Sequence, residues 1–127
     1  MTALLRSGVD LVDVLRVADL VTAGGAGFVD NVWTTAEQDY CGQRAEQLAG
    51  RWAAKEAAMK ALGVGFPDVS FLDIEVFGET GKAPLLRLRG AAAATAGTLG
   101  LTTWSVSISH ERDLAVAFVI ATGTMEP

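Results

Sequence analysis

The 127-residue chain is 50% hydrophobic and 20% charged, which is the composition of one globular domain and not of a disordered chain. Ten lysines and arginines against fifteen aspartates and glutamates leave a net charge of −5, which disfavours a general nucleic-acid binder. The single cysteine, Cys41, excludes an intramolecular disulfide and a cysteine-rich zinc site, and it fits a reducing compartment. We therefore expect one cytoplasmic domain over residues 1–127, without a signal peptide or a membrane helix.

The first elements predicted are a strand and a helix. Residues 3–12 are mainly aliphatic and predict a strand that passes into a helix near Val12. Apolar residues recur at helical spacing over residues 14–21. The glycine-rich run at residues 24–27 is expected to end that helix.

The next segments predict two further helices. Thr34 is a typical N-cap, and Glu37 places an acidic side chain in the first turn that follows. The strongest helix prediction covers residues 43–62, which are rich in good helix formers and contain no proline. Gly63 is a natural stop for this helix.

The second half of the chain predicts mostly strands. Residues 63–70 form a loop, and residues 71–77 and 85–89 form a hairpin around the turn at residues 78–82. A helix over residues 90–99 follows, and the last predicted elements are two strands, residues 102–109 and 114–121, joined by a turn at residues 110–113. This order predicts an α+β fold and not a doubly wound parallel sheet.

Asp10 is the first candidate for chemistry, since it is a carboxylate among aliphatic residues of the first strand. The ordinary interpretation is a helix N-cap at the end of the strand. The alternative is a ligand for a hard cation such as Mg²⁺, for which a carboxylate on a rigid strand is suitable.

The long helix carries the second group of candidates. Positions i and i+4 share a helix face, so Trp52, Glu56 and Lys60 form one stripe, with Arg51 and Lys55 as a pair beside it. The ordinary interpretation is a solvated Glu–Lys pair. The alternative, favoured by the surrounding alanines, is that Glu56 holds Mg²⁺ while the three cations neutralise phosphoryl oxygens.

Ser109 and His110 form the third group, where a strand ends and a turn begins. A lone histidine is more often structural than catalytic, but at this turn His110 could donate to a phosphate together with Ser109. Neither the P-loop nor the Gly-x-Gly-x-x-Gly fingerprint occurs in the sequence.

Five short motifs, taken together and in order, resemble the holo-acyl-carrier-protein synthase family. They are residues 8–12 with Arg16, 51–57 with 60–63, 73–76, 81–84 and 107–110. The second of them is similar to the central signature of that family, in which Lys-Glu-Ala follows an aromatic residue and precedes a second lysine. Each motif alone is weak, whereas five in the family order across nearly the whole chain are specific.

The resemblance implies a 4′-phosphopantetheinyl transferase, which moves phosphopantetheine from coenzyme A to a serine of an apo acyl carrier protein and releases 3′,5′-ADP. It also implies an antiparallel sheet packed on a long central helix, and a homotrimer with active sites between subunits. Asp10 and Glu56 would be the Mg²⁺ ligands, and Lys60 would act with them on the coenzyme A phosphates. The other coenzyme A-binding positions implied are Arg51, Gly81, Lys82, Pro84, Ser109 and His110, the last of them toward the 3′-phosphate.

Two features depart from the family pattern. The turn at residues 81–84 reads Gly-Lys-Ala-Pro, where family members have Gly-Lys-Pro. The helix after Asp10 offers Arg16 but little else that is basic, although members present a basic helix to their acidic carrier. Docking is therefore expected either near Arg16 and Arg51 or on a more apolar surface. Alternatively, the natural partner is a carrier protein other than that of fatty-acid synthesis. That apolar surface would consist of Val17, Leu20 and Val21.

Two alternatives to the transferase stay open. One is an oligomeric module that binds coenzyme A or another nucleotide without chemistry. The other is a structural oligomer in which Glu56 and Lys60 form an ordinary surface pair. For the transferase itself, the serine needs a base at neutral pH, and Glu56 and a water on the metal are both candidates.

Overall fold

The computed structural model describes residues 1–79 and 81–126, which form five strands, four α-helices and one short 3₁₀ helix. In chain order the elements are β1 (Thr2–Asp13), α1 (Val14–Val32), α2 (Thr35–Cys41), α3 (Ala45–Leu62), the 3₁₀ helix (Phe71–Asp73), β2 (Ile74–Phe77), β3 (Leu85–Leu88), α4 (Gly90–Leu99), β4 (Leu101–Glu111) and β5 (Leu114–Met125). None of the helices in this described part is long and apolar enough to cross a membrane.

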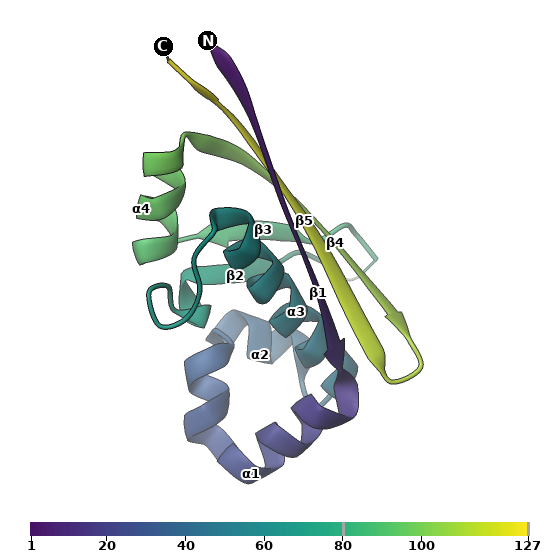
Figure 1. Ribbon diagram of the computed structural model, residues 1–127. Coiled ribbons are helices and arrows are strands. Elements are labelled where there is room, and N and C mark those ends of the chain that lie inside the picture. Colours follow the sequence, from purple (N-terminus) through teal and green to yellow (C-terminus); the bar gives the residue numbers. More distant parts are fainter. Residues whose placement is uncertain (80, 127) are drawn as a thin grey trace.

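The strands form two antiparallel sheets, which confirms the predicted α+β class. The larger sheet has the order β1-β5-β4, and the smaller one is the β2–β3 hairpin. All the helices lie on one side of the larger sheet, and α3 packs across that inner face (Figure 1). The long central helix and the antiparallel sheet are therefore confirmed as the frame of the fold.

Small side chains allow α3 to lie very close to the larger sheet. The residues that α3 buries completely include Ala53, Ala54, Ala57 and Ala58. Gly8 on β1 faces this surface, where an added Cβ would lie 1.8 Å from the carbonyl oxygen of Ala57. The backbones of β1 and α3 are therefore in direct contact at this point.

Helix α1 differs from the prediction at both its start and its middle. It begins at Val14, where Asp13 Oδ1 accepts a hydrogen bond from the backbone N–H of Leu15 at 2.9 Å. Asp13 is therefore the N-cap, and the N-cap interpretation of Asp10 is wrong. Gly25 breaks the helical geometry with φ of 63°, but helix resumes and continues to Val32, so the glycine run kinks the segment and does not end it.

Residues 71–77 were expected to form one strand, but the first three are a 3₁₀ helix. Ser70 Oγ accepts from the N–H of Leu72, and Asp73 Oδ2 accepts from the N–H of Ser70, so a local capping box competes with strand pairing. At the other end of the chain, β5 extends to Met125 because β1 pairs with it along its whole length.

Candidate active site

Two carboxylates meet between β1 and α3. Asp10 lies near the end of β1, and Glu56 lies half-buried on α3. Burial raises the pKa of Glu56, the nearby Asp10 carboxylate raises it further, and Lys60 and Arg16 oppose the shift. The structure therefore brings together the two residues that the sequence predicted as metal ligands.

Lys60 lies beside this pair. Its Nζ donates to the carbonyl oxygen of Val9 at 2.9 Å and lies 3.3 Å from Asp10 Oδ1. Because the ammonium is largely exposed while Asp10 is mostly covered, Lys60 is free to exchange this partner for another anion. Of the predicted stripe of Trp52, Glu56 and Lys60, the last two lie close enough for Lys60 to lower the pKa of Glu56. Trp52 packs instead with the rings of Phe28, Trp33 and Phe71.

The donor set suits Mg²⁺. Within the described ranges, 1–79 and 81–126, no group of three or more His, Cys, Asp or Glu side chains forms a closed metal site. Magnesium is usually held through one or two carboxylates and completes its shell with water and substrate phosphates. Asp10 and Glu56 fit that requirement, since they lie on two rigid elements with a half-open side.

Lys55 does not belong to this site. Its side chain is fully buried, forms an ion pair with Glu37 at 2.7 Å, and donates to the backbone carbonyls of Phe71 and Ile74. Burial lowers its pKa, and Glu37 opposes that shift. The prediction that Lys55 flanks Glu56 is wrong, because adjacent helix positions point about 100° apart.

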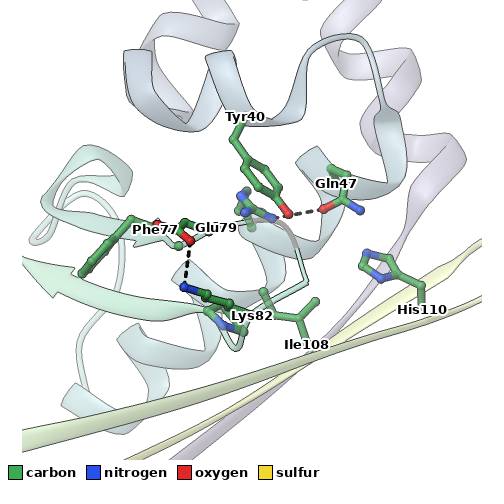
Figure 2. A pocket seen from close by; sticks show the side chains of 10 residues that line it. Tyr40, Gln47, Phe77, Glu79, Lys82, Ile108 and His110 are labelled. Carbon is green, nitrogen blue, oxygen red and sulfur yellow. Dashed lines mark hydrogen bonds and ion pairs between the residues drawn. The ribbon is translucent and has the colours of Figure 1, made fainter.

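A separate pocket lies between α2, α3, the β2–β3 turn and β4 (Figure 2). The side chains and glycine that line it are Tyr40, Gln47, Arg51, Phe77, Gly78, Glu79, Lys82, Pro84, Ile108 and His110. It combines basic groups with apolar walls, which is the composition expected for a site that takes an anion attached to a flat organic group.

Arg51 is the most deeply placed cation of the pocket, with only 6% of its surface exposed. Its guanidinium lies 4.1 Å from the centroid of the Tyr40 ring, and its Nη1 donates to Gln47 Oε1 at 3.2 Å. Its buried Nε has no hydrogen-bond partner in the described part of the chain. A buried donor without a partner is costly, so the inner wall of the pocket carries an unsatisfied polar group.

His110 enters the pocket from β4. Its Nε2 lies 2.7 Å from the carbonyl oxygen of Glu46, and because a carbonyl only accepts, this nitrogen is the donor. Gly50 makes room for it, since an added Cβ would lie 2.9 Å from His110 Nε2. Lys82 completes the basic groups at the rim, where it pairs with Glu79 at 2.9 Å.

Not every residue predicted for coenzyme A lies in this pocket. Arg51, Lys82, Pro84 and His110 line it, whereas Gly81 lies in the adjacent turn. Ser109 lines a different hollow, at the end of the β4–β5 hairpin, which His110 also borders.

Tyr40 and Gln47 were missed at the sequence level. Gln47 had a usable signal, because it lies four residues before Arg51 on the same helix and therefore on the same face. Tyr40 had none, since its place over Arg51 depends on how α2 packs against α3.

The residues predicted to dock the carrier protein differ in how exposed they are. Arg16 is exposed on α1, near the Asp10–Glu56 pair, whereas Arg51 is turned into the pocket. Of the apolar alternative, Val17 is buried and both Leu20 and Val21 are half-covered. Arg16 is thus the one predicted docking cation that a protein partner could reach freely.

The geometry agrees with what comparison with known proteins shows. The sequence pattern of the 4′-phosphopantetheinyl transferase superfamily matches residues 6–119. The chain belongs to this superfamily. It is 47% identical to the holo-[acyl-carrier-protein] synthase of Herpetosiphon aurantiacus, over 94% of this chain and 100% of that protein. The enzyme of the same name from Gloeobacter violaceus is 43% identical over 96% of each.

Solved structures of the superfamily have the same fold. A complex of ACPS from Chronobacterium ammoniagenes with CoA matches with a TM-score of 0.84 at 34% identity, covering 96% of this chain and 99% of that one. The Helicobacter pylori holo-[acyl-carrier-protein] synthase in complex with coenzyme A gives 0.82 at 31% identity, covering 91% and 98%. The chain is therefore an enzyme of the phosphopantetheinyl transferase class.

Proposed function

We propose that this transferase moves 4′-phosphopantetheine from coenzyme A to a serine of an apo acyl carrier protein, with Mg²⁺, and releases 3′,5′-ADP. The names of its relatives and the coenzyme A complexes of similar structures support the reaction. The single observation that carries the proposal is the meeting of Asp10 and Glu56 beside Lys60. The buried free thiol of Cys41 suits a cytoplasmic setting.

The chemistry follows from charge. Attack of a serine hydroxyl on the β-phosphorus of coenzyme A places negative charge on phosphoryl oxygens and on the departing 3′,5′-ADP. Mg²⁺ held by Asp10 and Glu56 would supply charge neutralisation and orient the diphosphate. Lys60 would leave Asp10 and donate to a phosphoryl oxygen, which adds stabilisation where the charge develops.

Glu56 is the candidate in this chain to accept the serine proton. In the chain without a metal ion, burial and Asp10 raise its pKa, so its carboxylate is more basic there than an exposed one. The same residue would serve as a metal ligand, so a water in the site stays an alternative base.

The basic pocket would hold the nucleotide end of coenzyme A. Arg51 and Lys82 offer donors to the 3′-phosphate, and His110, whose Nε2 donates to the carbonyl of Glu46, lines the same pocket. Phe77 and Pro84 would provide apolar contact for the adenine. Gly81 would shape the neighbouring turn, and Ser109 stays a prediction without a place in this pocket.

A homotrimer would cover the outer face of the larger sheet. Leu5, Val9, Leu11 and Phe118 are between 46% and 71% exposed there, and Val9 pairs directly with Phe118. Soluble monomers rarely leave a continuous apolar patch of this kind uncovered. A second copy of the chain would fit on this patch, because the helices of the same chain cover only the opposite face of the sheet (Figure 1). The carrier protein would approach Arg16, with the exposed Leu15 beside it.

The test is transfer itself. The chain is incubated with coenzyme A, Mg²⁺ and an apo carrier protein, and the intact mass of the carrier is measured. We expect a gain of about 340 Da, the size of the transferred group, lost when Mg²⁺ is removed by chelation or when the acceptor serine is replaced by alanine. Coenzyme A binding with no mass gain on fatty-acid, polyketide and peptide carriers would instead support the non-catalytic binding module.

A further inference from the structure

A buried ion pair joins three walls of the basic pocket. Lys55 on α3 and Glu37 on α2 are 2.7 Å apart and both side chains are fully buried. We call this pair, with its backbone contacts, the Glu37–Lys55 clamp. The proposed reaction uses neither residue.

The clamp ties α2 and α3 to the small sheet. Glu37 Oε2 accepts from the N–H of Val76 at 2.9 Å. Lys55 donates to the carbonyls of Phe71, which begins the 3₁₀ helix, and Ile74, which begins β2. Glu37 Oε1 also accepts from the N–H of Thr34 at the N-terminus of α2. Apart from the ion pair itself, every contact joins a side chain to backbone, so each one fixes the position of a chain segment.

Each clamped segment carries a residue of the pocket. Tyr40 follows Glu37 by about one turn of α2, Arg51 precedes Lys55 by about one turn of α3, and Phe77 is the neighbour of Val76 on β2. All three line the pocket, and the Tyr40 ring lies over the Arg51 guanidinium. The relative positions of these three side chains therefore depend on the clamp.

A second set of contacts extends the tie to the other strand of the hairpin. Thr34 Oγ1 donates to Glu75 Oε2 at 2.7 Å, and Glu75 Oε1 receives Arg87 and Arg89 at 3.2 and 3.1 Å. The turn between the two strands carries Lys82 and Pro84, so the rim of the pocket is anchored through the same network.

We propose that the Glu37–Lys55 clamp positions Tyr40, Arg51 and Phe77 for the nucleotide end of coenzyme A and so sets the affinity for that part of the substrate. The inference rests on the proposed function. A buried ion pair is seldom the most stable filling for a core, and a well-packed apolar pair often stabilises as much. Its directed hydrogen bonds, in contrast, specify one arrangement of three elements.

The test uses the double substitution Glu37→Gln with Lys55→Met, which removes both buried charges. Leu101→Ala is the control, because Leu101 is also buried but begins β4, about 20 Å along the strand from Ile108. For each protein we would measure urea unfolding, the Kd of 3′,5′-ADP by calorimetry, and KM for coenzyme A and kcat with a carrier protein.

We expect the double variant to bind 3′,5′-ADP about tenfold more weakly and to raise KM for coenzyme A by a similar factor, with kcat within about twofold, because the reacting atoms lie elsewhere. The control should keep wild-type Kd and KM despite its lower stability. If the double variant does not fold, Thr34→Val, which removes the Oγ1 contacts to Glu75 and to the N–H of Glu37 without leaving an unpaired buried charge, should weaken binding about threefold.

Two results would overturn the clamp: wild-type affinity in a folded variant, or an equal loss of affinity in Leu101→Ala. If the wild-type chain transfers phosphopantetheine and the variants bind 3′,5′-ADP with wild-type affinity, the clamp alone is contradicted. A wild-type chain that neither binds coenzyme A nor transfers contradicts the proposed function, and with it this inference.

Discussion

Glu56 is a carboxylate held half-buried beside a second carboxylate, and Lys60 and Arg16 offset only part of the resulting rise in its pKa. We expect Asp10→Asn and Glu56→Gln each to lower turnover by about 10²–10³-fold, since each removes one ligand for the charge that stabilises the transition state. Neither residue is part of the core, so thermal melting should stay within a few degrees of wild type. The rate of carrier mass gain measures the first effect and circular dichroism the second. Wild-type rates in both variants would contradict the metal assignment.

Cys41 offers a pH-dependent test of the core. Burial raises the pKa of its thiol from the ordinary 9.0 to about 11, with Arg51 the first of the opposing charges. Because the folded-state pKa lies above the unfolded one, the protonated thiol contributes stability that is present below pH 9 and is lost as the pH rises through about 11.

Native protein at pH 8 should therefore resist alkylation of Cys41 by iodoacetamide, whereas urea-unfolded protein should react within minutes. Mass spectrometry of the alkylated chain measures both. Rapid labelling of the folded protein would show that this thiol is neither buried nor protonated.

The residues of the acidic pair could be predicted from the sequence, because helix spacing places Glu56 and Lys60 together and the family motif adds Asp10. Lys55 could not be assigned, although it is adjacent to Glu56. Its partner Glu37 lies on another helix, and a charged residue in an alanine-rich helix carries no local signal of burial. Tyr40 was missed for the same reason, since only tertiary packing places it over Arg51.

At the scale of elements, the contact between β1 and α3 depends on Gly8. A methyl group there would lie 1.8 Å from the Ala57 carbonyl oxygen, and backbone has little freedom to move away. We expect Gly8→Ala to lower the free energy of unfolding by about 3 kcal/mol or more, through overpacking. Urea unfolding measures the loss.

Gly27→Ala is the matched control, because an added Cβ at Gly27 meets nothing within 4 Å and the site is helical. This variant should be as stable as wild type or slightly more so. A Gly8→Ala protein as stable as this control would contradict the close packing of β1 on α3.

The sequence predicted whether a segment is a helix or a strand more accurately than it predicted where that segment begins and ends. The prediction of a helix over residues 43–62 differs by two residues from Ala45–Leu62, since alanine-rich composition and Gly63 act locally. The strand expected at residues 114–121 runs to Met125, because pairing with β1 and β4 extends it beyond its apolar run. Pairing between distant segments leaves no local mark on the sequence.

At the scale of the whole molecule, the apolar outer face of the larger sheet is the surface that the proposed homotrimer would cover. We expect Phe118→Lys to shift the protein from a trimer toward a monomer, because a charge at the centre of a buried contact has no partner. Multi-angle light scattering on a sizing column measures the mass. Activity should fall together with the measured mass if the carboxylates of one chain and the pocket of another form a shared site.

Phe66→Lys is the control, since Phe66 is exposed in the loop after α3 and not on the sheet. It should leave the mass unchanged. A wild-type protein that runs as a monomer, or a Phe118→Lys trimer, would contradict the assignment of this face to a second copy.

The two ends of the chain lie together at one end of the larger sheet (Figure 1). Thr2 pairs with Met125, and the ladder continues without a break to Asp13 and Leu114. A force that draws the ends apart would act along the hydrogen bonds of this ladder and open them one rung at a time. Pulling on its two ends should therefore unfold the protein at low force, even if its thermal stability is high.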